Sequence, residues 1–192
     1  MDFMQKEIKK FIPYIEPELL KELEASHSMK FSDGQVLLHE GVSVPLIPIV
    51  VSGRLKVFRR KEDKELLLYY IRAGESCAMS FHACMTQSES KVIAISEGDT
   101  EAIIIPNEKL LSWLRKYPSL NAYMFKIYAK RYTDLLDTVD QLIFGNMEDR
   151  VLKYLAESLK DTDEKKLQLS HQEIAYDLGS AREVVSRVLK KL

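Results

Sequence analysis

Residues 169–192 hold a group of polar side chains whose types and spacing suit hydrogen bonding to DNA. This segment reads LSHQEIAYDLGSAREVVSRVLKKL, and one short turn at Gly179-Ser180 separates two helix-like runs. The second run brings four polar residues close together: Arg182, Glu183, Ser186 and Arg187. In the major groove, an arginine can donate two hydrogen bonds to guanine O6 and N7, and a glutamate can accept one from the exocyclic amine of cytosine. The pattern is typical of a helix whose first residues read base edges.

The residues around this turn predict a helix-turn-helix. Ser170 followed by Glu173 has the pattern of a capping box, and Ser180 followed by Glu183 repeats it at the start of the second helix. Gly179 can take the positive φ that the tight turn requires. Small and apolar residues that would hold the crossing helices together complete the pattern: Ile174, Ala175, Leu178, Val185 and Val188.

The expected DNA-binding surface extends beyond the base-reading positions. Ser186 suits a base or a phosphate, Lys190 suits a phosphate, and so does the amide-rich helix start at Ser180. Taken alone, each residue has a plainer explanation, such as Glu183 as half of a capping box or Arg187 as a solvated charge. Together they predict a DNA-binding site made of Ser180, Arg182, Glu183, Ser186, Arg187 and Lys190.

The composition is that of an ordinary soluble protein. The 192 residues include 46% hydrophobic and 30% charged residues, and the formal net charge is −1. A balanced charge argues against non-specific coating of nucleic acid, but it allows a local basic face. No apolar run approaches the roughly 20 residues that a membrane span needs, and the N-terminus lacks the apolar core of a secretory signal. We expect a cytoplasmic protein with no membrane partner.

Between residues 31 and 105 the sequence predicts β-structure. Short segments rich in β-branched and aromatic residues alternate there with turn signals such as those at Gly53 and Gly98. Many short strands at regular spacing indicate a sandwich or a barrel-like roll.

A long helix is predicted from about residue 119 to 144. Apolar residues step along it by three and four positions in a heptad-like seam, which we assign to dimerisation: Phe125, Tyr128, Tyr132, Leu135, Val139 and Leu142. A second stripe lies beside the seam: Leu120, Met124, Ile127, Leu136 and Ile143. Either one stripe packs on the roll and the other on a partner helix, or both face one core. The length of the seam favours the dimer.

Gly145 and Asn146 end this helix, and we place a hinge there. Asn146 can cap the helix that follows and leads to the helix-turn-helix. The predicted domains are therefore a sensor domain over 1–118, a dimerisation helix over 119–145 and a DNA-binding domain over 146–192.

These motifs resemble those of the Crp/Fnr family of bacterial transcription regulators, over nearly the whole chain. SHQEIAYDLGSAREVVSRVLKKL is similar to the family's helix-turn-helix, FSDGQVLLHEG to the opening of its roll, and EAIIIPNEKLLSWLRKYPSL to the exit into the dimer helix. The resemblance implies an α+β fold. It joins a cyclic-nucleotide-binding-type, double-stranded β-roll (jelly-roll-like), a long dimerisation helix and a winged helix-turn-helix. Because family members continue into a two-stranded wing, we expect the winged helix-turn-helix in this sequence to be truncated.

The resemblance also implies which bases are read. In the family, the positions of Glu183, Ser186 and Arg187 contact bases. The Glu-x-x-Ser-Arg spacing resembles the reader of TTGAT-like half-sites, and Arg182 beside Glu183 resembles the reader of TGTGA-like half-sites. Both half-sites contain TGA, so we expect an inverted repeat of that core. RNA polymerase is a further partner if the protein activates transcription.

The sensor domain departs from the family's cyclic-AMP site. The resemblance places an arginine and a serine at the cyclic phosphate, but Ser90 and Lys91 stand there in this chain. We therefore do not expect cyclic-nucleotide binding. An unidentified effector or a redox signal remains, and its candidate region is that of Glu75, Ser76, Ser90 and Lys91.

No cofactor and no metal is expected. An iron–sulfur cluster needs about four cysteine ligands, and the chain has two cysteines, Cys77 and Cys84. His82 is a conceivable haem ligand, but a lone histidine is more often structural. The two cysteines are expected to be inert packing residues rather than a thiol switch.

Two other classes of function have less support. A small-molecule or cyclic-nucleotide-sensing module that does not act on DNA would have no use for the helix-turn-helix. An enzyme would need a catalytic grouping, and the sequence has neither a Ser/His/Asp grouping nor a phosphate-binding glycine loop. The sequence predicts a homodimeric DNA-binding regulator rather than an enzyme.

Overall fold

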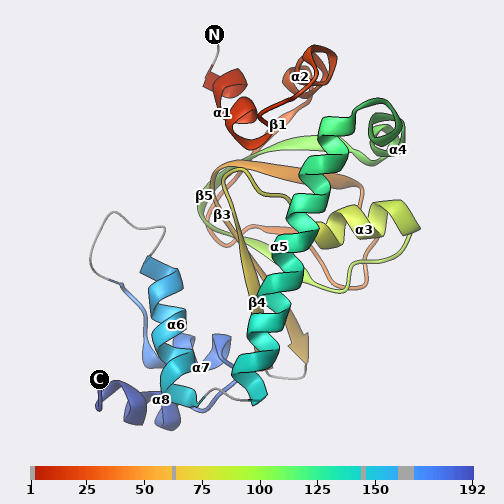
Figure 1. The fold of residues 1–192 in the computed structure, drawn as a ribbon. Coiled ribbons are helices and arrows are strands. Elements are labelled where there is room, and N and C mark those ends of the chain that lie inside the picture. Colours follow the sequence, from red (N-terminus) through yellow and green to blue (C-terminus); the bar gives the residue numbers. More distant parts are fainter. Residues whose placement is uncertain (1–2, 62–63, 144–145, 160–166) are drawn as a thin grey trace. The chain divides into compact units, whose positions relative to one another are not determined.

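The computed structural model describes residues 3–61, 64–143, 146–159 and 167–192, and its contacts divide the chain into two units (Figure 1). The roll unit comprises Met1–Phe58 and Tyr69–Tyr132. The helix-turn-helix unit comprises Arg59–Leu68 and Thr133–Leu192. The division falls inside the long helix α5 (Pro118–Ile143), so contacts alone do not test the predicted domain boundaries near residues 118 and 145. These boundaries stay a prediction.

In the described residues, five strands form one sheet that shapes the roll. They are β1 (Ser28–Phe31), β2 (Val36–Leu38), β3 (Leu46–Lys61), β4 (Lys64–Arg72) and β5 (Ile93–Pro106). The order is β1-β5-β3-β4, and β2 also pairs with β5. β5 runs antiparallel to β1, β2 and β3, and Ile103 of β5 lies in register with Ser28 on one side and Ile49 on the other. The predicted α+β class and N-terminal β-roll are confirmed.

Two glycines that the sequence marks as turns lie inside continuous strands. The sequence predicts separate short strands around Gly53 and Gly98, but β3 and β5 run on through them. Both glycines have positive φ, 76° and 73°, and the pairing of β3 with β5 shifts register around Ser52. A Cβ atom at Gly53 would come within 2.7 Å of Thr100 Cα, so this bend has no room for a side chain. Long strands bent at glycine let one sheet curve into a roll.

Apolar side chains of the sheet and its covering helices form the core of the roll unit. Fully buried sheet residues include Ile47, Val50, Leu55, Val57, Ile71, Ile103 and Ile105. Shorter helices of this unit are α1 (Phe3–Phe11), α2 (Pro17–Glu24), α3 (Ala78–Thr86) and α4 (Asn107–Lys116). The first part of α5 packs there too, with Leu120, Met124 and Ile127 buried. None of the helices in the described ranges is long and apolar enough to cross a membrane.

The helix-turn-helix unit contains α6 (Met147–Leu159), α7 (His171–Asp177) and α8 (Arg182–Leu189). Asn146 caps α6 as the sequence predicts, because its Oδ1 accepts a hydrogen bond from the Asp149 backbone N–H at 3.0 Å. Gly145, the other half of the predicted hinge, lies outside the described residues. Arg59–Leu68, where β3 ends and β4 begins, also belongs to this unit, and its Leu67 packs against the unit's core.

Candidate nucleic-acid interface

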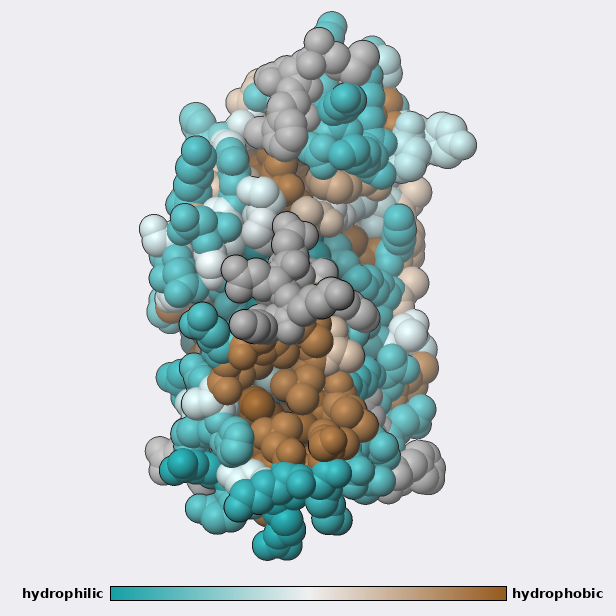
Figure 2. Space-filling model, turned by 90° about the vertical axis from the view of Figure 1, so that its left-hand side faces the viewer, coloured by the Kyte–Doolittle hydropathy of each residue, from teal (hydrophilic) through white to brown (hydrophobic). Residues whose placement is uncertain are grey.

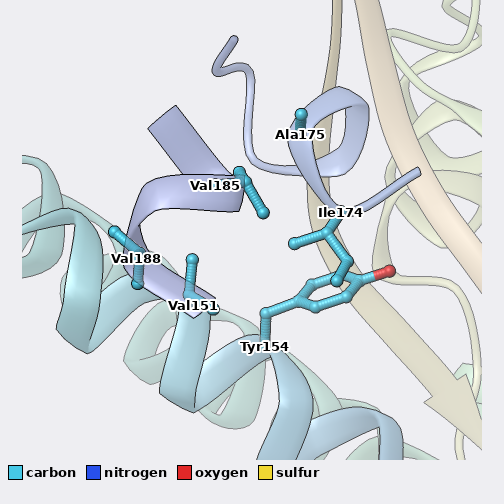
Figure 3. Packing of buried hydrophobic residues seen from close by; sticks show 6 residues of the cluster. All are labelled: Val151, Tyr154, Ile174, Ala175, Val185 and Val188. Atoms are coloured by element: carbon cyan, nitrogen blue, oxygen red, sulfur yellow. The ribbon is translucent and has the colours of Figure 1, made fainter. Parts of the chain in front are cut away.

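One small hydrophobic cluster holds α7 and α8 against α6. Its buried members are Val151, Tyr154, Ile174, Ala175, Val185 and Val188 (Figure 3). Leu178 is half-buried and packs against the same cluster. The apolar residues that the sequence assigns to this contact are therefore confirmed, and they leave the opposite face of α8 to the solvent.

Figure 2 shows a broad hydrophobic area in the lower part of the view. Exposed large apolar residues of the unit include Leu152 and Leu159 on α6 and Leu192.

Backbone hydrogen bonds close the turn between α7 and α8. Gly179 has a φ of 59°, and its N–H donates to the Tyr176 carbonyl at 3.1 Å. The N–H of Ser180 donates to the carbonyl of Ala175 at 2.8 Å. This left-handed residue after a helix is the usual way to end one helix and start another at once. The prediction that Gly179 supplies the positive φ is confirmed.

The two predicted capping boxes have different outcomes. At α7 the box is formed: Ser170 Oγ accepts from Glu173 N at 3.2 Å, and Glu173 Oε2 accepts from Ser170 N at 2.6 Å. At α8 the prediction is wrong, because the N-cap is Ala181 and no side chain caps the helix. Ser180 lies one residue before the N-cap, and its N–H, which Glu183 would need in a capping box, donates to the Ala175 carbonyl instead. The Glu183 carboxylate therefore makes no capping hydrogen bond.

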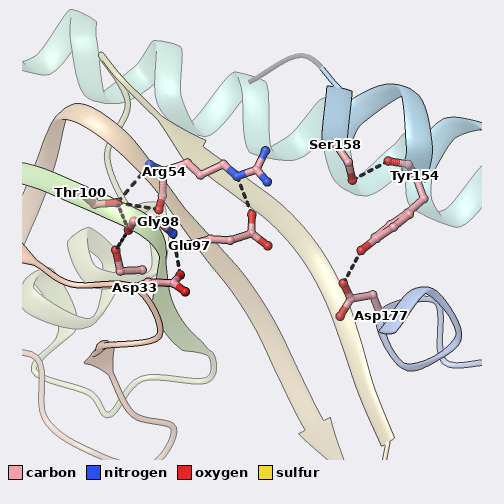
Figure 4. Close-up of polar contacts among 9 residues, drawn as sticks. Asp33, Arg54, Glu97, Gly98, Thr100, Tyr154, Ser158 and Asp177 are labelled. Atoms are coloured by element: carbon pink, nitrogen blue, oxygen red, sulfur yellow. Dashed lines mark hydrogen bonds and ion pairs between the residues drawn. The ribbon is translucent and has the colours of Figure 1, made fainter. Parts of the chain in front are cut away.

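A buried polar contact fixes the end of α7 to α6. Tyr154 donates from its hydroxyl to Asp177 Oδ2 at 2.7 Å, and both side chains are buried (Figure 4). Arg150 Nη2 donates to the Leu178 carbonyl at 2.6 Å just after α7 ends. Sequence reasoning missed this contact, because Asp177 looks like one more surface charge. The start of the turn is thus held by hydrogen bonds as well as by apolar packing.

The outward face of α8 carries the predicted base-reading residues. Arg182, Glu183 and Arg187 are exposed, and Lys190 is exposed just beyond the helix. Within the described ranges, none of these four side chains has a hydrogen-bond or ion-pair partner. Ser180 and Ser186 are half-buried, and Ser186 is bonded to a residue that the sequence did not point to. Its Oγ lies 2.9 Å from His171 Nδ1, at the start of α7.

Arg60 of β3 and Glu65 of β4, which belong to the same unit, lie near α7 and the turn that follows it. Arg60 Nη2 pairs with Glu65 Oε1 at 2.5 Å, and a further hydrogen bond joins Arg60 to the Tyr176 side chain. These contacts, first with Glu65 and then with Tyr176, raise the pKa of Arg60. A Cβ atom at Gly179 would lie 3.7 Å from the Glu65 carbonyl oxygen. The sequence did not predict these contacts of Arg60 and Glu65, because it assigned β3 and β4 to the roll alone.

The residues of the predicted dimer seam differ in how exposed they are to solvent. Phe125, Tyr132, Leu135 and Val139 are exposed, with Phe125 at 75% and Tyr132 at 65%. Tyr128 instead faces its own roll unit, where it donates to the Ala78 carbonyl at 3.3 Å and lies edge-on to Phe81. The side chain of Leu142 lies outside the described part of the chain.

The candidate effector residues are engaged in contacts within the roll unit. Glu75 pairs with Lys130 and Arg131 of α5 and accepts from Arg72 N at 3.2 Å. Ser76 Oγ donates to the Pro48 carbonyl at 2.7 Å. Sequence reasoning gave no sign of the two basic partners on α5.

The other two candidate residues lie in a separate segment. Ser90 is buried and donates to the Val92 carbonyl at 2.8 Å, and its backbone pairs with Gly41 and Val42. Lys91 is exposed. No contact in the described residues joins this pair to Glu75 and Ser76, so the four residues do not form one cluster.

One small hollow lies in the roll unit. A hollow lined by Leu38, Val44, Leu55, Cys77 and Ser80 has a volume of about 10 Å³, which is roughly the space of one water molecule. Cys77 accepts a hydrogen bond from Ser80 N at 3.4 Å, and Cys84 donates to the Val44 carbonyl at 3.4 Å. Burial, and secondly the nearby Cys77, raise the pKa of Cys84 to about 11. Both cysteines are free thiols in this structure.

Two family models match separate parts of the chain. The family model described as the cyclic nucleotide-binding domain matches residues 28–117, and the model described as bacterial regulatory proteins, crp family, matches residues 167–192. Together they cover the roll and the helix-turn-helix. The expectation of a DNA-binding regulator is therefore confirmed.

Similar proteins are regulators of the same kind. The cyclic AMP receptor protein of Thermus thermophilus is 26% identical over 84% of this chain and 74% of its own length. The cAMP-activated global transcriptional regulator CRP of Pasteurella multocida is 25% identical over 94% of this chain and 89% of its own.

A solved structure shares the fold. The c-di-GMP-responsive global regulator CLP of Xanthomonas campestris has a TM-score of 0.74 at 24% identity, over 90% of this chain and 89% of the other. The relatives named above are transcription regulators and not enzymes, in agreement with the sequence prediction. The chain belongs to the Crp/Fnr family of bacterial transcription regulators.

Proposed function

We propose that this protein acts as a homodimer that binds an inverted DNA repeat with TTGAT-like half-sites sharing a TGA core. The observation that carries the proposal is the outward face of α8. Arg182, Glu183 and Arg187 are exposed there, and no partner among the described residues occupies them. Glu183 in particular is released from capping, because Ala181 begins the helix. Charged groups that have no structural task on a rigid helix are suited to reading base edges.

Each residue of this face has a role in the proposal. Arg187 and Arg182 are suited to guanine O6 and N7, and Glu183 to the exocyclic amine of the cytosine in the TGA core. Ser186 contacts a base or a phosphate. Ser180, near the unpaired amides at the start of α8, and Lys190 beyond its end contact phosphates and position the helix.

The dimer is proposed to form through α5. Three residues of its second stripe, Leu120, Met124 and Ile127, are buried in the roll. The exposed apolar residues on the same helix are left for a partner: Phe125, Tyr132, Leu135, Leu136 and Val139. Two recognition helices in one dimer would enter successive major grooves about 34 Å apart, which is the spacing that an inverted repeat requires.

Regulation is proposed to enter through the roll. The relatives named above respond to cyclic AMP or to c-di-GMP, and here a small effector of unidentified chemistry would take that role. Glu75 binds Lys130 and Arg131 of α5, so a ligand that disturbed Glu75 would also disturb the dimer helix. Such a coupling is typically about 1–3 kcal/mol. RNA polymerase would be a further partner of an activator.

The test is fluorescence anisotropy with a labelled duplex that holds an inverted TTGAT/ATCAA repeat, against a scrambled duplex of the same composition. Measurements at two salt concentrations separate phosphate contacts from base contacts. We expect tighter binding to the repeat, and we expect Arg187→Ala to lower that preference by about 1–3 kcal/mol. Equal affinity for both duplexes at both salt concentrations would contradict the half-site. Binding to neither, together with binding of a nucleotide, would favour a sensing module that does not act on DNA.

A further inference from the structure

His171 and Ser186 form a hydrogen bond that links the two helices of the DNA-binding motif. The Nδ1 atom of His171 lies 2.9 Å from Ser186 Oγ. His171 is the first residue of α7, and Ser186 lies in the middle of α8, beside the exposed Arg187. The histidine is exposed and the serine is half-buried. The contact therefore lies at the edge of the face that α8 turns to the solvent.

The surrounding structure sets the geometry of this contact. Ser170, immediately before His171, is fixed by the capping box with Glu173. On α8, Val185 immediately before Ser186 is fully buried in the cluster of Figure 3. Each partner therefore follows a residue that cannot move without loss of packing or capping. The backbone positions of His171 and Ser186 are fixed in this way.

The bond controls what Ser186 can offer to a base. A serine hydroxyl has one proton to donate, and its oxygen can also accept. If Nδ1 accepts the hydroxyl proton, the oxygen can only accept from DNA, for example from the amine of cytosine or adenine. If Nδ1 carries a proton and donates it, the hydroxyl is free to donate to guanine, to thymine O4 or to a phosphate.

We propose that His171 is a specificity-determining residue, which selects the base preference of Ser186 by fixing the direction of its hydroxyl hydrogen bond. This inference rests on the proposed function, since it requires Ser186 to face DNA. His171 acts through Ser186 as a positioning residue. Removing the ring leaves Ser186 in the interface but lets its hydroxyl rotate, so discrimination at one base pair is lost.

The experiment begins with selection of duplexes from a random-sequence pool by the unaltered chain, so that it does not depend on the TTGAT expectation. Every single base-pair change of the selected half-site is then measured by competition. The variants are Ser186→Ala, His171→Ala, His171→Asn, His171→Gln and the double variant of His171→Ala with Ser186→Ala. His39→Asn is the matched control, because this exposed histidine lies on the roll unit.

We expect Ser186→Ala and His171→Ala to lower discrimination about tenfold at the same base pair, and the double variant to show no further loss. An asparagine carries its hydrogen-bonding atoms close to the place of Nδ1, whereas a glutamine carries them close to that of Nε2. His171→Asn is therefore expected to restore discrimination at that base pair, and His171→Gln is not. His39→Asn is expected to match the unaltered chain.

Three results would overturn the inference. His171→Ala could leave discrimination unchanged at the base pair that Ser186→Ala affects. It could instead weaken binding equally to all duplexes, which would make His171 a phosphate contact. Glutamine could restore discrimination where asparagine does not, which would place the active nitrogen at Nε2. A selection that yields no preferred sequence at all would remove the proposed function itself, and the inference with it.

Discussion

The chain contains the pattern Ser-x-x-Glu twice within its helix-turn-helix, and the two copies do different work. At Ser170 and Glu173 both reciprocal hydrogen bonds of a capping box are formed. At Ser180 and Glu183 neither is formed, and Ala181 is the N-cap of α8. The residue letters are the same, so the difference comes from what precedes each serine.

The turn explains the difference. Ser170 follows an irregular segment and is free to take the extended conformation of an N-cap, with φ −78° and ψ 154°. Ser180 follows Gly179, and its N–H is already used by the Ala175 carbonyl. Glu183 therefore has no free N–H to accept from at Ser180, and the N-cap of α8 is Ala181. The first pair belongs to the structure of the motif, and the second leaves an exposed carboxylate, which we propose for base recognition.

The largest expected effect is on DNA sequence discrimination, which distinguishes Glu183 from Glu173. Glu183→Ala is expected to lower discrimination at the guanine–cytosine pair of the TGA core by about 1–3 kcal/mol, because one amine of cytosine loses its acceptor. Glu173→Ala should leave this discrimination unchanged. Competition anisotropy with single base-pair variants measures both. A loss of discrimination in Glu173→Ala of the same size would remove the distinction between the two pairs.

The second effect concerns the turn that creates the difference. Gly179→Ala is expected to lower the free energy of unfolding by about 1–2 kcal/mol, because alanine is strained at a positive φ of 59°. Space is not the cause, since the nearest atom to a Cβ there would be the Glu65 carbonyl oxygen at 3.7 Å. Urea denaturation monitored by circular dichroism measures the change. An unchanged stability would mean that the turn relaxes to another geometry.

A smaller effect distinguishes the two serines by stability. Ser170→Ala is expected to lower the free energy of unfolding by about 1 kcal/mol, which is typical of a lost N-cap. Ser180→Ala should cost less, because its hydroxyl caps nothing. The two variants form a matched pair for the same urea titration. Equal losses in both would indicate that the second capping box forms in solution.

The smallest effect concerns an N-cap in the roll unit that uses sulfur instead of oxygen. Cys77 caps α3 through its sulfur, and Cys84 lies buried in the same helix. Because its pKa is about 11, only about one Cys84 side chain in a thousand is a thiolate at pH 8. We expect thiol alkylation of Cys84 at that pH to be slow and DNA binding to be unaffected by mild oxidants. Rapid labelling of Cys84 in peptide mapping would reopen a redox signal.

The sequence predicted those features that depend on local pattern. The capping box at Ser170, the positive φ of Gly179 and the apolar contacts of Ala175 all follow from residue type and spacing, and all are confirmed. The roll was predicted for the same reason. The bends at Gly53 and Gly98 were predicted as turns, because a glycine inside a long strand carries the same local signal as a glycine between two strands.

Features that depend on distant partners were missed. Nothing near Asp177 shows that it is buried against Tyr154 of another helix, and nothing near Glu75 shows its two basic partners on α5. The bond between His171 and Ser186 joins residues 15 positions apart and needs the crossing angle of the two helices. Local periodicity cannot supply such information, because it arises only when the elements pack.

The most direct test removes a single group from the DNA. The cytosine of the TGA core is replaced by a pyrimidine analogue that lacks the exocyclic amine, and binding is measured by anisotropy for the unaltered chain, Glu183→Ala and Glu173→Ala. If Glu183 accepts from that amine, the replacement costs the unaltered chain and Glu173→Ala about tenfold in affinity and costs Glu183→Ala nothing. The same loss in all three proteins would contradict the assignment of Glu183 to a base. It would also contradict the different roles proposed for the two Ser-x-x-Glu pairs.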